Sequence, residues 1–269
     1  MAGLKNQFLV ALSFLTIFKV DTGEAVFSSQ ERIFARSAAF FPLVGALLGL
    51  ILAAVDALFA LLFPLTVSSV VVLLAGAFFT AGLHLDGFAD TMDGLGAFFK
   101  GGREKALAVM KDSRSGALGV LGLVLLILFK YSLLVEISGS ARYLSLFLMP
   151  VSGRWLLAPA GQIYPYARSA SGLGEGFAGR ITNREVVIAL CWVFFCALAG
   201  AAAGGAAARP WLFALTLGGL FISWAGAALF AAYLARCFGG MTGDTLGAVS
   251  ELGELFFLLG VAALTRIWA

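Results

Sequence analysis

Long apolar runs with almost no charge dominate this sequence and restrict the folds open to it. The runs at 38–63, 67–85 and 211–234 are continuous rather than alternating in polarity. A helix of about 20 apolar residues spans the hydrocarbon core of a bilayer. Strands of a transmembrane barrel would instead alternate polar and apolar residues over about 10 positions. The pattern therefore predicts a helical membrane protein and excludes a barrel.

The composition leads to the same fold class. Hydrophobic residues make up 61% of the 269 residues and charged residues 12%, whereas soluble domains contain about 25% charged residues. We therefore expect one all-α, polytopic integral membrane domain over residues 1–269, with about six to eight transmembrane or re-entrant helices. The net charge of +3 singles out no partner by itself. We expect a lipid bilayer around the chain and no nucleic-acid partner, and the oligomeric state stays open.

Seven apolar segments are predicted to span the membrane. They are 38–63, 67–85, 118–135, 143–163, 186–207, 211–234 and 255–268. The fourth contains Pro150 and Pro159, and the last is short. The segment 8–18 is shorter than a usual span, so an amphipathic helix, a re-entrant segment and a short span are all open for it.

Positive charge gathers in four of the segments that flank these spans. The residues are Arg32 and Arg36, then Lys100, Arg103, Lys105, Lys111 and Arg114, then Arg168, Arg180 and Arg184, then Arg236. These segments alternate along the chain with nearly uncharged ones, so they fall on one side of the membrane. Because loops rich in lysine and arginine stay in the cytoplasm, we expect this side to face the cytoplasm of an inner membrane.

Three aspartates follow the second predicted span, in the stretch "HLDGFADTMDGL". Asp86, Asp90 and Asp93 stand at positions i, i+4 and i+7, which places them on one face of a helix. Their carboxylates repel one another unless a cation joins them. Mg²⁺ prefers such oxygen ligands and usually keeps water and substrate phosphate as its remaining ligands. The spacing therefore predicts a magnesium site.

A second acidic set lies in "GGMTGDTLGAVSELGEL", on the predicted cytoplasmic side. Asp244, Glu251 and Glu254 stand at i, i+7 and i+10, which is again one helical face. A solvated acidic edge beside the lipid headgroups is the plain alternative for either set alone. Two such sets on one side, each next to an apolar span, favour a shared metal site, and we expect these three residues to be metal ligands too.

Cations and glycines near the first set suggest a site for phosphate. In "MKDSRSGALG", Lys111 and Arg114 precede Gly116 and Gly119 at the start of a predicted helix. Free N–H groups at a helix N-terminus and basic side chains both bind phosphate oxygens. Carboxylates for a cation and cations for a phosphate suggest phosphoryl or nucleotidyl transfer at a membrane surface. The predicted substrate contacts are Lys111, Ser113, Arg114, Gly116 and Thr242.

Four stretches resemble one enzyme family. "FFPLVGALLG", "GLHLDGFADTMDGL", "MKDSRSGALG" and "GGMTGDTLGAVSELGEL" occur in the order found in the cobalamin synthase family, the adenosylcobinamide-GDP ribazoletransferases, over nearly the whole chain. The resemblance implies an integral enzyme of the cytoplasmic membrane that uses Mg²⁺. It implies transfer of the phosphocobinamide group of adenosylcobinamide-GDP to α-ribazole or its 5′-phosphate. The products would be adenosylcobalamin, or its 5′-phosphate, and GMP.

The resemblance also suggests roles for the acidic residues. Asp86, Asp90 and Asp93 would be catalytic and hold Mg²⁺ on the pyrophosphate, and Asp93 would accept the proton of the attacking hydroxyl. The second acidic set would complete another metal position or orient that hydroxyl.

Two further residues carry expectations of their own. His84, the one histidine, precedes Asp86 by two residues. On a helix it would face away from the aspartates, so we expect a hydrogen-bonding histidine at the membrane interface rather than a general base. Arg154 lies within a predicted span, where an arginine needs a partner. Asp56 and Glu136 are the two candidates for that partner.

Two other functions compete with this interpretation. CDP-alcohol phosphotransferases also carry spaced aspartates beside a membrane helix, but Asp90 stands here where their motif has arginine, and their later aspartates are missing. A cation-coupled transporter would also place acids and glycines in its helices. Against it, the acids are expected at one membrane face, and no inverted repeat is visible.

Overall fold

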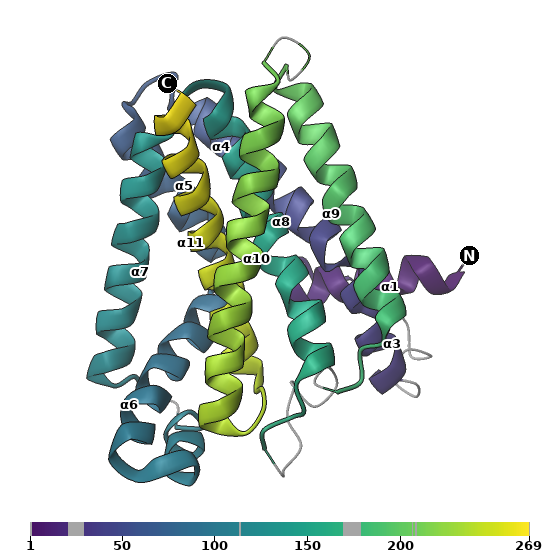
Figure 1. The fold of residues 1–269 in the computed structure, drawn as a ribbon, viewed down its shortest axis with the longest axis vertical. Helices are drawn as coiled ribbons and strands as arrows, with labels where there is room; N and C mark the ends of the chain where they lie inside the picture. Colours follow the sequence, from purple (N-terminus) through teal and green to yellow (C-terminus); the bar gives the residue numbers. More distant parts are fainter. Residues whose placement is uncertain are drawn as a thin grey trace.

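The structure, a computed structural model, describes residues 2–20, 30–112, 114–168, 179–205, 207 and 209–268. Figure 1 shows long helices lying side by side along the longest axis. No β-strand occurs within the described ranges, which confirms the all-α fold class. The helices are α1 (Ala2–Leu15), α3 (Gln30–Ser37), the 3-10 turn η1 (Ala38–Phe40), α4 (Phe41–Phe59), α5 (Leu65–Phe79), α6 (Leu83–Val109), α7 (Ala117–Glu136), α8 (Gly139–Ile163), α9 (Asn183–Ala203), α10 (Trp211–Phe238) and α11 (Gly243–Trp268).

Several helices are long and apolar enough to cross a membrane. Within the described part of the chain there are five, and α5 with α6 makes a sixth if this bent pair counts as one span. The five are Ile33–Phe59, α7, α9, α10 and Gly243–Ile267. Large apolar side chains on their outer faces are exposed, among them Leu125, Phe195 and Leu229. Such surfaces suit lipid rather than water, so the polytopic membrane fold is confirmed.

Helix α8 is the buried centre of the bundle. It packs against α4, α9, α10 and α11, and most of its residues are buried. Glycines of α4 permit the closest of these contacts, because a Cβ at Gly49 would lie 2.1 Å from the carbonyl oxygen of Phe147. The helix continues through Pro150 and Pro159, as transmembrane helices do when neighbouring groups satisfy the freed carbonyls.

The second predicted span, 67–85, is interrupted. Helix α5 ends at Phe79, and α6 leaves it at an angle of 91°. Ala81 and Gly82 have φ angles of +49° and +66°, a left-handed conformation that stops a right-handed helix. The prediction of one continuous span was therefore wrong, and the first acidic motif begins a new helix.

The last predicted span, 255–268, starts too late. Helix α11 begins at Gly243 and runs for 26 residues to Trp268. Glu251 and Glu254 therefore lie well inside a membrane helix and not in a cytoplasmic segment. Neighbouring cations make this possible, as described below.

Helix α1 lies across the other helices rather than alongside them (Figure 1). It has 14 residues and packs against α3, η1 and α4. The N–H of Ile17, just beyond it, donates a 2.9 Å hydrogen bond to the carbonyl of Phe79. The N-terminal segment is thus tied to the bend between α5 and α6.

A buried ion pair joins α8 to α4. Arg142 donates to both carboxylate oxygens of Asp56, at 2.8 Å and 2.6 Å, and also to the carbonyl of Leu134. Ser68 and Ser69 of α5 complete the network. Asp56 is therefore the partner of Arg142 and not of Arg154.

Candidate active site

Helices α6 and α11 cross in close contact where both carry acidic motifs. A Cβ at Gly87 would lie 2.8 Å from the carbonyl oxygen of Asp244, and one at Gly247 would lie 3.2 Å from the Cα of His84. These glycines let the two backbones touch. The contact brings the acidic motif of α6 against Asp244 of α11. Asp86 and Asp244 are 158 positions apart in the sequence.

Four aspartates gather around this crossing. The negative charges of Asp86, Asp244 and Asp93 all act on Asp90, and Arg168 is the cation that opposes them there. Asp86 is exposed, whereas Asp90, Asp93 and Asp244 are half-buried. Like charges held this close repel one another. The carboxylates thus form a region of negative potential that one arginine balances incompletely.

Arg168 is a site residue that sequence reasoning missed, because it was counted as a membrane-orienting charge. Its Nη2 lies 2.7 Å from Oδ2 of Asp244. Its segment is held by a parallel bridge, in which Ala167 donates to the carbonyl of Met241 and Met241 to that of Pro165, both at 2.8 Å. The signal available was its place shortly after Pro165 and Tyr166 in the linker between α8 and α9, which is weak on its own.

A cavity of about 270 Å³ opens at the start of α6 and α11. Its polar side is formed by His84, Asp86, Arg168 and Asp244. Its apolar side is formed by Phe14, Phe41, Leu157 and Leu246. Ligand sites typically combine such apolar walls with a few polar groups that fix orientation. We take this hollow, hereafter the acidic cavity, as the candidate active site.

Asp93 contacts the start of α7 instead of the acidic cavity. Its carboxylate accepts hydrogen bonds from the N–H groups of Gly116, at 2.6 Å, and Gly119, at 2.9 Å. A Cβ at either glycine would lie 2.4 Å from a carboxylate oxygen of Asp93. The helix N-terminus that was predicted to bind substrate phosphate is thus engaged by a carboxylate of the protein.

The predicted phosphate-binding residues between α6 and α7 lie outside the acidic cavity. Lys111 is exposed, and Arg114, whose side chain is 87% exposed, pairs with Asp112 at 2.6 Å. Hydrogen bonds from the side chain and the backbone N–H of Arg114 lower the pKa of Asp112 to about 2. Ser113 lies outside the described residues.

Thr242 immediately precedes α11. It is buried, its hydroxyl accepts from the N–H of Thr245 at 3.2 Å, and its own N–H donates to the Thr245 hydroxyl at 2.7 Å. Its hydroxyl also lies 3.3 Å from Oδ2 of Asp244. The structure therefore gives Thr242 the task of holding Asp244 at the helix start.

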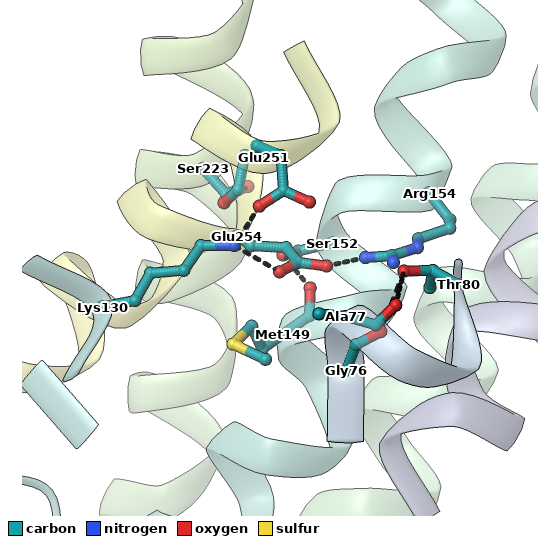
Figure 2. A network of polar contacts seen from close by, with 11 residues as sticks. Gly76, Ala77, Thr80, Lys130, Met149, Ser152, Arg154, Ser223, Glu251 and Glu254 are labelled. Atoms are coloured by element: carbon teal, nitrogen blue, oxygen red, sulfur yellow. Dashed lines mark hydrogen bonds and ion pairs between the residues drawn. The ribbon is translucent and has the colours of Figure 1, made fainter. Parts of the chain in front are cut away.

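Glu251 and Glu254 belong to a different, buried network (Figure 2). The Lys130 ammonium reaches between them and lies 2.6 Å from an oxygen of each. Arg154 approaches Glu254 from the other side and forms an ion pair with it. All four side chains are 7% exposed or less. Two cations and two anions thus compensate one another inside the bundle.

This network changes two expectations. The partner of Arg154 is Glu254. The two predicted partners were wrong, because Asp56 pairs with Arg142 and Glu136 pairs with Arg266. Lys130 was missed, although a lysine within an apolar run is a signal for a buried partner. The four charged residues also line a second cavity of about 320 Å³, which is mostly apolar and takes its other walls mainly from α4, α5, α7 and α8.

The six predicted metal ligands therefore do not form one protein cage. Among the residues that the structure describes, no three histidine, cysteine, aspartate or glutamate side chains are close enough to hold an ion on their own. Mg²⁺ is usually held by one or two carboxylates, with water and substrate phosphate as its other ligands. The unbalanced carboxylates of the acidic cavity fit this coordination, and the compensated glutamates do not.

His84 also departs from its expectation. It is buried, and its Nδ1 has no hydrogen-bond partner within the described structure. Because the bend before α6 turns the helix start inward, His84 lines the same cavity as Asp86. It is not a hydrogen-bonding interface residue.

Comparison with known proteins places the chain in a family. Residues 7–262 match the family model described as cobalamin-5-phosphate synthase. Adenosylcobinamide-GDP ribazoletransferases of Geotalea daltonii and Pseudomonas fluorescens are 38% and 37% identical to it. These alignments cover 96% and 95% of this chain, and 97% and 98% of the relatives. No solved structure matches the chain. The protein is thus a member of the cobalamin-5-phosphate synthase family.

Proposed function

We propose that this protein is an adenosylcobinamide-GDP ribazoletransferase. It would transfer the phosphocobinamide group to a hydroxyl of α-ribazole or α-ribazole 5′-phosphate and release GMP. The observation that carries the proposal is the acidic cavity, where Asp86, Asp244 and Arg168 meet an apolar wall. Family membership favours this reaction over the CDP-alcohol phosphotransferase and transporter alternatives, because the relatives named above are ribazoletransferases.

The donor set of the acidic cavity supports a Mg²⁺ cofactor. Asp86 and Asp244 line the cavity from two helices that touch at Gly87. These two carboxylates would hold the ion. When bound, Mg²⁺ neutralises the charge of a pyrophosphate and of its leaving group.

The residues of the chain would bind the reacting groups and move one proton. A ribose hydroxyl attacks the phosphorus next to the cobinamide arm, and the bond from that phosphorus to the bridging oxygen of the pyrophosphate breaks. The electron pair leaves with GMP. Asp90 would accept the hydroxyl proton, because its partial burial and the surrounding carboxylates favour a proton there. Arg168, paired with Asp244, would bind phosphate oxygens.

Asp93 would act at a distance from the reacting atoms. Its two hydrogen bonds fix the start of α7 against α6. We therefore propose that it positions the helix that carries Asp86 and Asp90, rather than accepting the proton itself.

The test is GMP release by purified protein in detergent or liposomes. Adenosylcobinamide-GDP and α-ribazole 5′-phosphate are supplied with Mg²⁺ or with EDTA, and GMP is followed by chromatography. Asp86→Asn and Asp90→Asn should each lower the rate about 100-fold or more. Glu136→Gln, at the far end of the bundle, is the matched control and should stay active. No GMP from folded wild-type protein would remove the assignment.

The orientation of the protein can be tested independently. The end of the bundle that holds the acidic cavity also carries most of the lysines and arginines, so we propose that it faces the cytoplasm of the inner membrane. Phe99 lies in α6 at this end and Leu62 follows α4 at the other, and they are 74% and 81% exposed. In intact cells, a membrane-impermeant thiol reagent should label Leu62→Cys and spare Phe99→Cys. The reverse pattern would contradict the orientation.

A further inference from the structure

We propose that the acidic cavity holds the aromatic base of the ribazole, and that His84 hydrogen-bonds to the free ring nitrogen of that base. This inference rests on the proposed function and names the part of the protein that selects the acceptor substrate. His84 would be a specificity-determining residue and would take no part in bond breaking.

The chemistry of the base matches the walls of the cavity. A ribazole carries a benzimidazole, a flat bicyclic ring with one nitrogen bonded to ribose and the other free to accept a hydrogen bond. Its remaining surface is apolar. The cavity offers Phe14, Phe41 and Leu157 as apolar walls, and a neutral imidazole offers one N–H donor.

His84 lacks a partner that a bound base could supply. The residue is 4% exposed, and its Nδ1 is buried without a hydrogen-bond partner in the described structure. A buried polar group without a partner is unfavourable and usually has a reason. Because His84 lines the acidic cavity, a ligand there is a partner that the described residues do not provide.

The substrate also requires that the residue contacting the base lie close to the carboxylates. Base and ribose are joined by a single glycosidic bond, so the base must sit next to the site where the ribose hydroxyl reacts. His84 is two residues from Asp86 on α6, and both line one cavity with Asp244. The larger apolar cavity beside Lys130 shares neither aspartate, so it does not meet this condition.

The N-terminal helix completes the apolar wall. Phe14 of α1 stacks on Phe41 of α4, with ring centroids 6.2 Å apart and an interplanar angle of 22°. Aromatic rings pack favourably against further flat aromatic groups. This gives α1, which lies across the bundle, a direct part in binding the base.

The test exchanges one atom of the substrate and one residue of the protein. The substrates are α-ribazole and its indole analogue, in which the free ring nitrogen is replaced by C–H. We expect wild-type kcat/KM to favour α-ribazole by about tenfold or more. In His84→Leu this preference should fall to about one, whereas His84→Asn, which keeps a donor, should retain part of it. Asp90→Asn is the control that should lower both rates by the same factor.

The outcomes separate the inference from the proposed function. If wild-type protein forms no GMP from either substrate, the proposed function fails. If wild-type protein turns over both substrates equally, the base does not meet a donor and the inference is overturned, even if the His84 variants do not fold. A folded His84→Leu protein that slows both substrates alike and keeps the preference would also overturn it, because a structural role predicts that result.

Discussion

Replacing Lys130 by methionine should destabilise the protein strongly, and a second substitution should reverse most of the loss. The Lys130 ammonium lies 2.6 Å from Glu251 and 2.6 Å from Glu254, and Arg154 is the other cation of the group. Lys130→Met leaves one uncompensated negative charge inside the bundle. Glu251→Gln alone leaves one uncompensated positive charge. The double variant is neutral again and keeps the Arg154–Glu254 pair.

The magnitudes follow from the burial of the group. Breaking a buried ion pair by removing one partner costs about 3–5 kcal/mol, because the remaining charge is uncompensated. Two independent losses would therefore add up to about 6–10 kcal/mol. In the double variant the main cost is a buried glutamine amide, about 1–3 kcal/mol. The two substitutions should thus be coupled by several kcal/mol.

Unfolding by SDS in mixed micelles, followed by tryptophan fluorescence, gives the relative free energies of the four proteins. GMP release per folded molecule is measured on the same samples. The double variant should unfold later than either single variant and should keep near wild-type turnover, because neither residue lines the acidic cavity.

Two results would refute this reasoning. Additive losses in the double variant would mean that the charges do not compensate one another. A stable but inactive double variant, with Glu251→Gln alone equally inactive, would mean that Glu251 acts in the chemistry, as its sequence motif first suggested.

Three further substitutions test other contacts. Gly87→Ala should lower GMP release about tenfold or more and destabilise the fold by about 1–3 kcal/mol, because its Cβ would lie 2.8 Å from the backbone of Asp244. Gly76→Ala is the matched control and should behave as wild type in both assays, because its Cβ would meet one methyl group at 3.9 Å. Asp56→Asn should cost about 3–5 kcal/mol in SDS unfolding without changing KM, since it leaves Arg142 buried without its counter-ion. Arg114→Gln should leave the unfolding midpoint unchanged, because its partner Asp112 lies with it at the surface, and a large shift would show that this loop is packed.

The fold class was predictable because apolar length decides it. Runs such as 118–135 and 211–234 became α7 and α10 with small changes at their ends. The two wrong boundaries share one cause. Hydropathy reports only how apolar the local side chains are. It therefore misses the bend at Ala81 and Gly82, which is a property of the backbone. It also makes the acidic start of α11 look like a loop, because the residues that pack against that start are distant in the sequence.

The candidate site was predictable in part, for a related reason. Spacing on one helix placed Asp86 and Asp90 correctly on one element, and two motifs on the same side suggested Asp244. Spacing carries no information on what another helix contributes. It therefore could not show that Asp93 meets the N-terminus of α7, or that Arg168 reaches Asp244 from a linker.

Charge balance separates the acidic residues better than their motifs do. Glu251 and Glu254, which are buried, each have a cation within ion-pair distance, as expected for charges that a low-dielectric interior tolerates. Among the described residues, three carboxylates and one arginine act on Asp90, and Asp86 is exposed. A fold gains nothing from that excess, since repulsion between like charges opposes packing. The excess of carboxylates where α6 and α11 touch is best explained by a ligand that brings positive charge. For this reason we place the cation at Asp86 and Asp244 rather than at Glu251 and Glu254.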